Sequence, residues 1–230
     1  MPQTFIDNWI KTKGWKLHDH QIKMIQSGAS GSSSLLIAPT GGGKTLAGFL
    51  PSIIELNAYP TNSLHTIYIS PLKALTVDVA RNLLNPLSEM GLKITVETRT
   101  GDTPQSKRQR QRKSPPNILL TTPESLALLI SYPDSAAIFQ KLRCVIIDEL
   151  HALAPTKRGD LLSLALARLN KWAPKARRVG LSATIPYPEE MAEYLSCGQK
   201  IKTVQIIQAQ PTKKPMIQIL IGNSRLPWPG

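Results

Sequence analysis

The feature of this sequence that most restricts its fold is a series of seven short apolar, β-branched runs with helical segments between them. Several runs are apolar throughout instead of alternating, which is typical of strands buried on both faces of a sheet. The intervening segments carry apolar residues at helical spacing, as at Leu72, Val79 and Leu83. This alternation predicts an α/β fold with a mostly parallel sheet and helices on both faces, in three α/β/α layers. The runs are Leu35–Ala38, Thr66–Ile69, Ile94–Glu97, Ile118–Thr121, Cys144–Ile147, Val179–Ser182 and Val204–Ile207.

Two stretches interrupt this alternation, and the end of the chain differs from the rest. Residues Ser27–Ser34 are mostly serine and glycine, which predicts a flexible loop ahead of the first strand. Residues Gln105–Lys113 carry five basic side chains in nine positions. From about Pro211 the sequence becomes irregular. We therefore predict one domain over residues 1–210 and a linker over residues 211–230 that leads toward a part absent from this chain.

A glycine-rich segment follows the first predicted strand and opens the next predicted helix. Glycines let the backbone curl so that successive N–H groups point at one anion, and the helix N-terminus adds its positive dipole end. In such a P-loop, Lys44 reaches the β- and γ-phosphates and the Thr45 hydroxyl binds Mg²⁺. The alternative is a glycine-rich turn that happens to precede Lys-Thr, and the usual first glycine of the motif is replaced here. The predicted ATP-binding residues are Ala38, Pro39, Thr40, Gly41, Gly42, Gly43, Lys44 and Thr45.

Two adjacent carboxylates, Asp148 and Glu149, follow the apolar run Cys144–Ile147 and precede His151. In an open α/β sheet, ligands bind beyond the carboxyl ends of the strands, which is where this pair is expected. There Asp148 binds Mg²⁺ through water, and Glu149 polarises the attacking water as a general base. The alternative role is capping of the next helix.

The triplet Ser182-Ala183-Thr184 also follows a predicted strand. Its two hydroxyls are predicted to sense the γ-phosphate through His151, although a Ser/Thr turn or a helix cap gives the same pattern. Joint occurrence favours the functional interpretation, because all three motifs follow strands. The sequence therefore predicts a P-loop NTPase whose catalytic residues are Lys44, Asp148, Glu149 and His151.

These motifs resemble motifs I, II and III of the superfamily 2 DExH-box helicases, and further segments match the family in order. Gln21 stands where the family has an adenine-reading glutamine, and Ser70–Leu75 resembles motif Ia. Thr98–Thr103 and Thr121–Leu126 resemble the next two motifs, which contact nucleic acid. The resemblance implies a RecA-like fold, ATP and Mg²⁺ as cofactors, and a nucleic-acid strand bound by Ser70, Pro71, Lys73, Arg99, Thr100, Gly101, Thr121, Thr122 and Pro123.

A more specific resemblance, over residues 5 to 196, is to the Lhr (large helicase-related) family and its bacterial ligase-associated core form. It rests on Ala47–Pro51, Val96–Pro104 and Lys157–Leu161. The resemblance implies an ATP-dependent 3′-to-5′ translocase on single-stranded DNA that unwinds duplexes, including RNA–DNA hybrids, in DNA repair.

The family's motor has two RecA-like domains with ATP between them, and the second domain carries motifs IV to VI with the arginine fingers. Nothing resembling that domain follows in this chain. An arginine finger is worth roughly 10³ to 10⁵ in rate. We therefore expect the chain alone to bind ATP·Mg²⁺ and a nucleic-acid backbone, to hydrolyse ATP weakly and not to unwind.

The formal net charge of +13, from 28 Lys and Arg against 15 Asp and Glu, favours a polyanionic partner. For the basic run Gln105–Lys113, phosphate contact and a solvated helix face both remain open. Two cysteines without metal-ligand spacing indicate a reduced, cytoplasmic compartment, and Cys144 is predicted to be a small core residue. No signal peptide or membrane span is predicted. The spacing of His18, His20 and His65 predicts no metal site.

Two other functions remain alternatives. The same motifs fit an RNA helicase lobe, because phosphate and sugar contacts do not show a preference for the 2′-hydroxyl. They also fit a non-catalytic fragment that binds nucleic acid in an ATP-dependent way.

Overall fold

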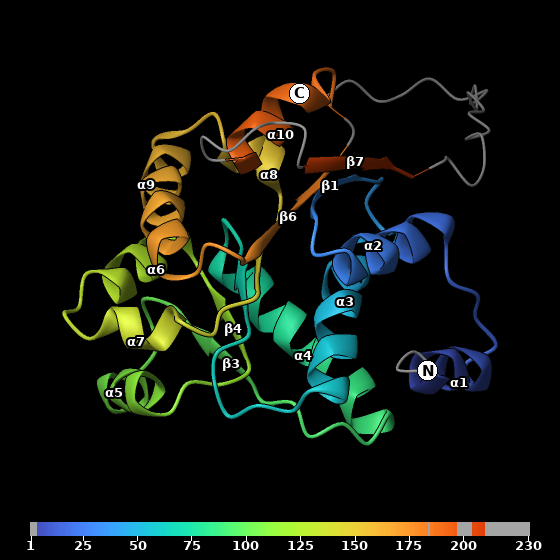
Figure 1. The fold of residues 1–230 in the computed structure, drawn as a ribbon, viewed down its shortest axis with the longest axis horizontal. Coiled ribbons are helices and arrows are strands. Elements are labelled where there is room, and N and C mark those ends of the chain that lie inside the picture. The colour runs from blue at the N-terminus through green and yellow to red at the C-terminus, as the bar shows by residue number, and fades with distance from the viewer. Residues whose placement is uncertain (1–3, 184, 197–203, 210–230) are drawn as a thin grey trace, which may run out of the picture.

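The computed structural model describes residues 4–183, 185–196 and 204–209, and within them seven strands form one parallel sheet (Figure 1). The strand order is β3-β4-β2-β5-β6-β1-β7. Thr184 and the predicted linker lie outside the described residues. The predicted parallel α/β fold is confirmed. The strands are β1 (Ser33–Ile37), β2 (Thr66–Ile69), β3 (Val96–Arg99), β4 (Ile118–Thr121), β5 (Cys144–Ile147), β6 (Arg177–Ser182) and β7 (Val204–Gln208).

Helices cover both faces of the sheet, as the alternation predicts. One apolar cluster joins a face of the sheet to α2, α3 and α4, and a second joins the other face to α6–α10. Figure 1 shows α2 and α3 on the right of the sheet and α6, α7 and α9 on the left. The helices are α1 (Thr4–Thr12), α2 (Asp19–Ala29), α3 (Lys44–Ala58), α4 (Lys73–Glu89), α5 (Gln105–Lys113), α6 (Pro123–Ile130), α7 (Ser135–Phe139), α8 (Leu150–Leu153), α9 (Lys157–Trp172) and α10 (Pro188–Ser196).

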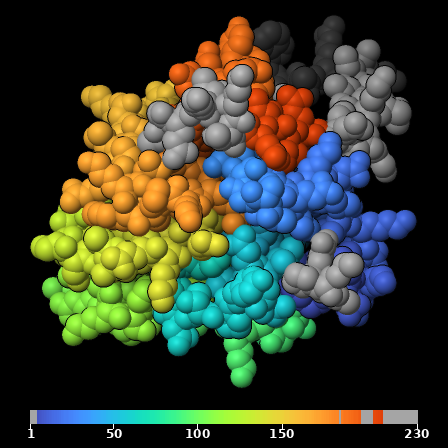
Figure 2. Space-filling view, in the orientation of Figure 1, coloured from blue at the N-terminus to red at the C-terminus, as the bar shows by residue number. Residues whose placement is uncertain are grey.

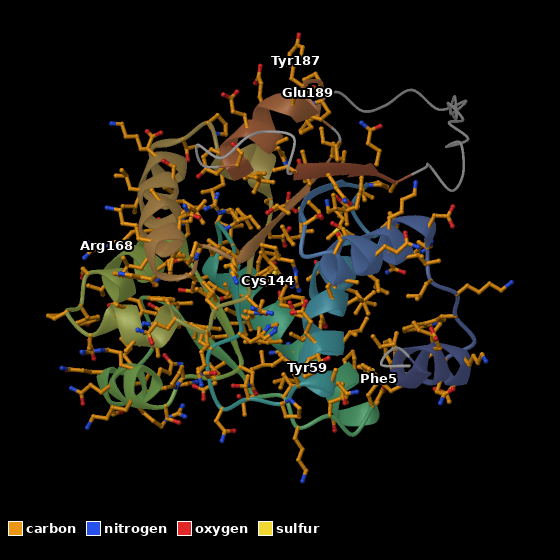
Figure 3. All side chains as sticks on the ribbon, viewed as in Figure 1. Phe5, Tyr59, Cys144, Arg168, Tyr187 and Glu189 are labelled. Atoms are coloured by element: carbon orange, nitrogen blue, oxygen red, sulfur yellow. The ribbon has the colours of Figure 1, made fainter. Side chains whose placement is uncertain are left out.

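The central strands are buried on both faces, which explains why their sequences are apolar throughout. In β5, Val145 and Ile147 belong to the cluster under α6–α10, whereas Cys144 and Ile146 belong to the cluster under α3 and α4. Cys144 is a fully buried free thiol at the centre of the view in Figure 3, in agreement with the sequence prediction. Burial of each such aliphatic side chain contributes about 1.5–3 kcal/mol.

Outside the sheet, α1 packs against α2 and α3 through a cluster that includes Trp9, Ile25 and Leu50. Figure 2 shows α1 on the right side of the surface and α9 on the left side. Among the described residues, no helix is long and apolar enough to cross a membrane.

The predicted flexible loop Ser27–Ser34 is wrong for most of its length. Helix α2 continues to Ala29 and β1 begins at Ser33, so only three residues connect them. The Ser27 and Ser34 hydroxyls are buried and lie 2.5 Å apart in a hydrogen bond. A Cβ on Gly28 would approach Pro51 of α3 to 2.3 Å. The small residues therefore allow close packing of α2 rather than flexibility.

The strand order divides the carboxyl edge of the sheet into two halves. β1, β6 and β5 are neighbours, and the P-loop, the Ser182 triplet and the Asp148 pair follow them. β2, β4 and β3 are also neighbours, and the predicted nucleic-acid motifs follow them. We call these the β1-β6-β5 half and the β2-β4-β3 half, and they meet where β2 pairs with β5.

Candidate nucleotide site and nucleic-acid surface

The glycine-rich segment forms a curled loop between β1 and α3. Gly41 and Gly43 have φ angles of 79° and 72°, which residues with a Cβ rarely adopt. Ala38 is buried, and its N–H donates to the Ser182 carbonyl 3.1 Å away, so it continues the sheet before the loop begins. The non-glycine first residue of the motif is therefore a core position.

Lys44 opens α3 directly after this loop, with Thr45 beside it in the first turn. The Lys44 side chain is 7% exposed, and its Nζ has no hydrogen-bond partner among the described residues. A buried ammonium without a partner costs several kcal/mol, so the arrangement suits an anion that supplies the missing partner. The curled glycines, the helix N-terminus and this orphaned cation together fit a nucleotide phosphate chain.

The start of α2 lies against the same loop. Gln21 is 4% exposed, and its Oε1 accepts a hydrogen bond from the His18 N–H at 2.9 Å. A Cβ on Gly43 would lie 2.8 Å from the Gln21 Nε2. A cavity of about 390 Å³ separates the start of α2 from the loop and the end of β7, with His18, His20, Gly42 and Ala209 in its lining. Recognition of adenine by Gln21 stays a prediction.

Asp148 follows β5 and is 6% exposed. Its Oδ1 accepts a hydrogen bond from the Glu149 N–H at 2.9 Å, and its Oδ2 accepts one from the Tyr68 hydroxyl. Burial raises the pKa of the Asp148 carboxyl above its usual range, while the hydrogen bonds and Lys44 oppose the shift. A nearby cation would stabilise the ionised form of this carboxyl group, which is otherwise costly to form. No cluster of three or more acidic, His or Cys metal ligands occurs in the described ranges.

Glu149 occupies a left-handed backbone conformation, with φ 48° and ψ 42°. This conformation costs a residue with a Cβ about 1–2 kcal/mol, and strain of this kind concentrates at functional sites. The Glu149 Oε2 lies 3.5 Å from the His151 Nε2, which is an electrostatic contact.

His151 connects this carboxylate to the end of β6. Its Nδ1 lies 3.2 Å from the Ser182 hydroxyl and 3.3 Å from the Ala183 N–H. Because a backbone N–H can only donate, Nδ1 is the acceptor and the neutral ring carries its proton on Nε2, facing Glu149. The His151 imidazole therefore connects Glu149 of the acid pair to Ser182 and Ala183 of the triplet. Thr184, the third residue of the triplet, lies outside the described residues.

The β2-β4-β3 half presents its exposed residues along a groove of about 390 Å³ between the first turns of α4 and α5. Lys73 and Lys107 both line it. The Lys73 Nζ is bonded to both carboxylate oxygens of Asp102, at 2.9 and 3.1 Å. Gly101 is exposed beside this pair, and Pro71 is half-buried. Both helices begin without a side-chain cap, so their first N–H groups are available.

Other predicted nucleic-acid contacts have buried side chains. The Arg99 side chain is 1% exposed, and its Nη1 donates to the Arg108 carbonyl at 3.0 Å. The Thr121 hydroxyl is fully buried and donates to the Arg99 carbonyl at 2.7 Å. Their contact with a nucleic-acid strand stays a prediction, and in this structure the two side chains hold the loops that carry the exposed groups. The same burial applies to Ser70, Thr100, Thr122 and Pro123.

The basic run forms α5, and three of its arginines have partners within the domain. Arg108 donates to the carbonyls of Thr103 and Gly101, Arg110 pairs with Glu97 at 2.6 Å, and Arg112 pairs with Asp134 at 2.6 Å. Most of the run thus attaches α5 to its surroundings. Of the two open interpretations, phosphate contact is best supported for Lys107, which lines the groove.

Two contacts at the β1-β6-β5 half were not predicted from the sequence. In the sequence, Tyr68 looks like any apolar residue of a buried strand. No local pattern therefore predicts that its hydroxyl donates a hydrogen bond to Asp148. His20 bonds the Gly42 carbonyl, and its position directly before Gln21 was the available signal. Cavity size alone would not identify the candidate nucleotide site, because a larger cavity of about 630 Å³ lies at the opposite, amino end of the sheet beside Arg143 and Lys175.

Residues 18–192 match the DEAD/DEAH box helicase family. The chain belongs to that family. Among curated relatives, it is 44% identical over 211 residues to the Lhr helicase/probable uracil glycosylase of Mycolicibacterium smegmatis, covering 85% of this chain and 14% of the relative. It is 40% identical over 205 residues to the ATP-dependent helicase Lhr-Core of Methanocaldococcus jannaschii, covering 83% of this chain and 24% of the relative. It is thus a helicase domain of Lhr type.

A solved structure of the Mycobacterium smegmatis helicase Lhr bound to ssDNA and AMP-PNP matches this helicase domain with a TM-score of 0.82 and 40% identity. The match covers 91% of this chain and 28% of that one. The helicase domain therefore spans between a seventh and about a quarter of the first curated relatives it matches.

Proposed function

We propose that this chain is the ATP-binding first lobe of an ATP-dependent, 3′-to-5′ DNA translocase and helicase that acts in DNA repair in the cytoplasm. Alone it binds ATP·Mg²⁺ and a nucleic-acid backbone, hydrolyses ATP slowly and does not unwind. The observation that carries the proposal is the orphaned Lys44 ammonium beside a curled glycine loop, on the same sheet edge as Asp148. The relative solved with AMP-PNP and ssDNA supports both ligand classes.

Each residue of the site has a definite task in this proposal. Lys44 and the loop N–H groups hold the phosphates, while Thr45 and Asp148 hold Mg²⁺, Asp148 through water. ATP·Mg²⁺ supplies the phosphoanhydride bond whose hydrolysis drives the motor. Glu149 accepts a proton from the attacking water, with its carboxylate oriented by the His151 Nε2–H.

The nucleic-acid strand is proposed to follow the groove between α4 and α5. Lys73, Lys107 and the uncapped helix ends offer cationic and N–H donors to phosphates, and none of them reads base identity. The Lys73–Asp102 pair is exposed, so it is worth at most about 1 kcal/mol and is readily exchanged for a phosphate.

The first test is equilibrium binding of a fluorescent ATP analogue to the 230-residue chain with Mg²⁺. Lys44→Ala is expected to weaken binding about 100-fold, because the buried cation that meets the phosphates is lost. Lys93→Ala removes one exposed positive charge outside the site and serves as the matched control. Equal affinities for wild type and Lys44→Ala would exclude the proposed site.

The second test separates the remaining functions by comparing matched single strands of DNA and RNA and by measuring turnover. Tighter binding of DNA and slow hydrolysis that ssDNA does not accelerate strongly are expected. Preference for RNA would favour the RNA helicase alternative. Fast, DNA-stimulated turnover by the 230-residue chain would contradict the need for a second lobe.

A further inference from the structure

His20 contacts the phosphate loop from a helix that carries none of the phosphate-binding residues. Its Nε2 lies 2.9 Å from the Gly42 carbonyl oxygen, and its side chain is 7% exposed. The contact joins residues 22 apart in sequence, from the first turn of α2 to the middle of the loop.

The chemistry of the two partners fixes the direction of this hydrogen bond. A carbonyl oxygen can only accept, so the His20 Nε2 carries a proton and donates it. Burial lowers the pKa of His20, so the ring is neutral near pH 7 with its proton on Nε2. The imidazolium form also donates from Nε2, so the bond survives protonation.

A donor on the Gly42 carbonyl acts on the neighbouring N–H as well. The Gly42 carbonyl and the Gly43 N–H belong to one peptide unit, and a hydrogen bond accepted by the oxygen polarises the N–H at the other end. In a P-loop, successive N–H groups face the anion. His20 therefore strengthens one donor of the phosphate cradle and holds the peptide that precedes Gly43, a glycine in a left-handed conformation.

The surroundings of His20 keep its ring in place. Its face stacks on His18, with ring centroids 5.2 Å apart and an angle of 8° between the planes. On the next residue of the helix, Gln21 lies so close to Gly43 that a Cβ there would be 2.8 Å from its Nε2. Helix α2 thus holds the loop at two successive glycines. The same end of the helix forms one wall of the cavity of about 390 Å³ that lies between α2, the phosphate loop and the end of β7.

We propose that His20 is a positioning residue for the phosphate cradle. Through its hydrogen bond to the Gly42 carbonyl, His20 makes the position of the phosphate-binding N–H donors depend on the position of α2 beside the cavity at the phosphate loop. The inference rests on the proposed ATP-binding function. It assigns to His20 a role in phosphate affinity that needs no contact with the nucleotide base.

Inorganic pyrophosphate is the probe that distinguishes this role from contact with the base. Pyrophosphate occupies the cradle and has no base, so a residue that acts through the cradle affects it as much as ATP. Competition of pyrophosphate and of ATP against a fluorescent ATP analogue is measured with the 230-residue chain and Mg²⁺. His20→Phe keeps a stacked ring and removes the donor, and it is expected to weaken both ligands about fivefold to tenfold.

Two further variants complete the design. His20→Gln places an amide N–H near the position of Nε2 and is expected to restore pyrophosphate affinity to within about twofold of wild type. Gln26 is exposed on the same helix and does not line the cavity beside the phosphate loop, so the control Gln26→Ala is expected to leave pyrophosphate affinity unchanged. Weakening of ATP alone by His20→Phe, or His20→Gln as weak as His20→Phe, would overturn the inference.

A measurement on the wild-type chain covers the case in which His20→Phe does not fold. Nitrogen NMR of the histidine rings is expected to show His20 as the Nε2–H tautomer at neutral pH, and an Nδ1–H tautomer would overturn the inference. Wild type that binds neither ATP nor pyrophosphate would overturn the proposed function and this inference together. Wild type that binds both, with an unaffected His20→Phe, would overturn the inference alone.

Discussion

The two halves of the carboxyl edge differ in whether their charged groups already have partners. In the β1-β6-β5 half, the buried Lys44 Nζ has no partner in the part of the chain that the structure describes, and the Glu149 backbone is strained. In the β2-β4-β3 half, Lys73 is paired with Asp102, and Arg110 with Glu97. The first half is prepared for its ligand, whereas a phosphate that binds Lys73 in the second half has to displace a carboxylate.

The carboxyl groups of the two halves show the same contrast. Burial raises the pKa of Asp148, since its hydrogen bonds and Lys44 do not compensate for the lost solvation. Burial also acts on Glu97, but there the bonds from Arg110 and Gln111 prevail and lower its pKa. Asp148, the acid proposed to hold Mg²⁺, is therefore costly to ionise, whereas Glu97, which already has a cationic partner, is not.

Glu149→Gln gives the largest expected effect, because it removes the proposed general base while keeping the size of the side chain. Hydrolysis is expected to fall about 10² to 10⁴-fold, with ATP affinity within a few-fold of wild type. The measurement is turnover and ATP binding in the longest form of the protein that can be purified. Unchanged turnover would show that the strained Glu149 conformation serves something other than proton transfer.

Tyr68→Phe tests the contact that crosses from one half to the other. Tyr68 belongs to β2, its hydroxyl donates to Asp148, and it also contacts Ser70 at the start of the predicted motif Ia. Loss of this donor to a carboxylate is expected to weaken the Mg²⁺-dependent part of ATP affinity about tenfold. Affinity measured in EDTA should not change. A uniform loss with and without Mg²⁺ would point to a packing defect instead.

Asp102→Asn removes the carboxylate that pairs with Lys73. The β2-β4-β3 half should then resemble the β1-β6-β5 half in having an unpaired lysine ammonium. Single-strand affinity is expected to rise about twofold to fivefold, because the exposed pair contributes at most about 1 kcal/mol. The salt dependence of binding should steepen by about 0.7 for each additional phosphate contact. Asp78→Asn, on the same helix as Lys73, is the matched control. Equal gains from both variants would show a general charge effect.

The smallest expected effect is the pH dependence of stability, which has opposite signs in the two halves. Because the pKa of Asp148 is raised, its ionisation costs stability as the pH rises through that pKa. Asp148→Asn without Mg²⁺ should thus raise the Tm near pH 7, and the gain should vanish below about pH 4.

The lowered pKa of Glu97 gives the reverse dependence. Its stabilisation is complete above the ordinary glutamate pKa of about 4.3 and is lost as the pH falls through the lowered value. Glu97→Gln should therefore lower the Tm near pH 7 and converge with wild type in acid. Both shifts are expected to be about 1 to 3 °C, and thermal unfolding monitored by circular dichroism measures them. Equal pH profiles for the two variants would remove the contrast between the halves.

The sequence predicted the sheet and the order of its motifs because both depend on local patterns. Doubly buried strands such as Cys144–Ile147 are apolar throughout, and the phosphate loop needs adjacent glycines. β3 was displaced by two residues in the prediction, which placed it at Ile94–Glu97. As an edge strand it is partly exposed, and Thr95 before it is held by the Asn117 side chain, so its apolar signal is weaker.

The remaining errors concern contacts between residues far apart in sequence. Gly28 looks flexible until Pro51 is placed against it, and nothing near position 28 reveals that packing. The burial of Arg99 could not be predicted from the sequence either, because it depends on how α5 folds over it. Tyr68 is indistinguishable from any apolar strand residue until its hydroxyl meets Asp148.

Strand β7 gives the nucleotide site a mechanical connection to whatever follows. It pairs in parallel with β1 through five consecutive residues, and the Ala209 N–H extends the ladder to the Ile37 carbonyl at 2.8 Å. Gln208 and Ala209 also line the cavity beside the phosphate loop. A pull on the chain after Ala209 loads these evenly spaced bonds together, including those at residues that line the cavity. The β1–β7 hydrogen bonds thus connect the chain after Ala209 to one wall of this cavity.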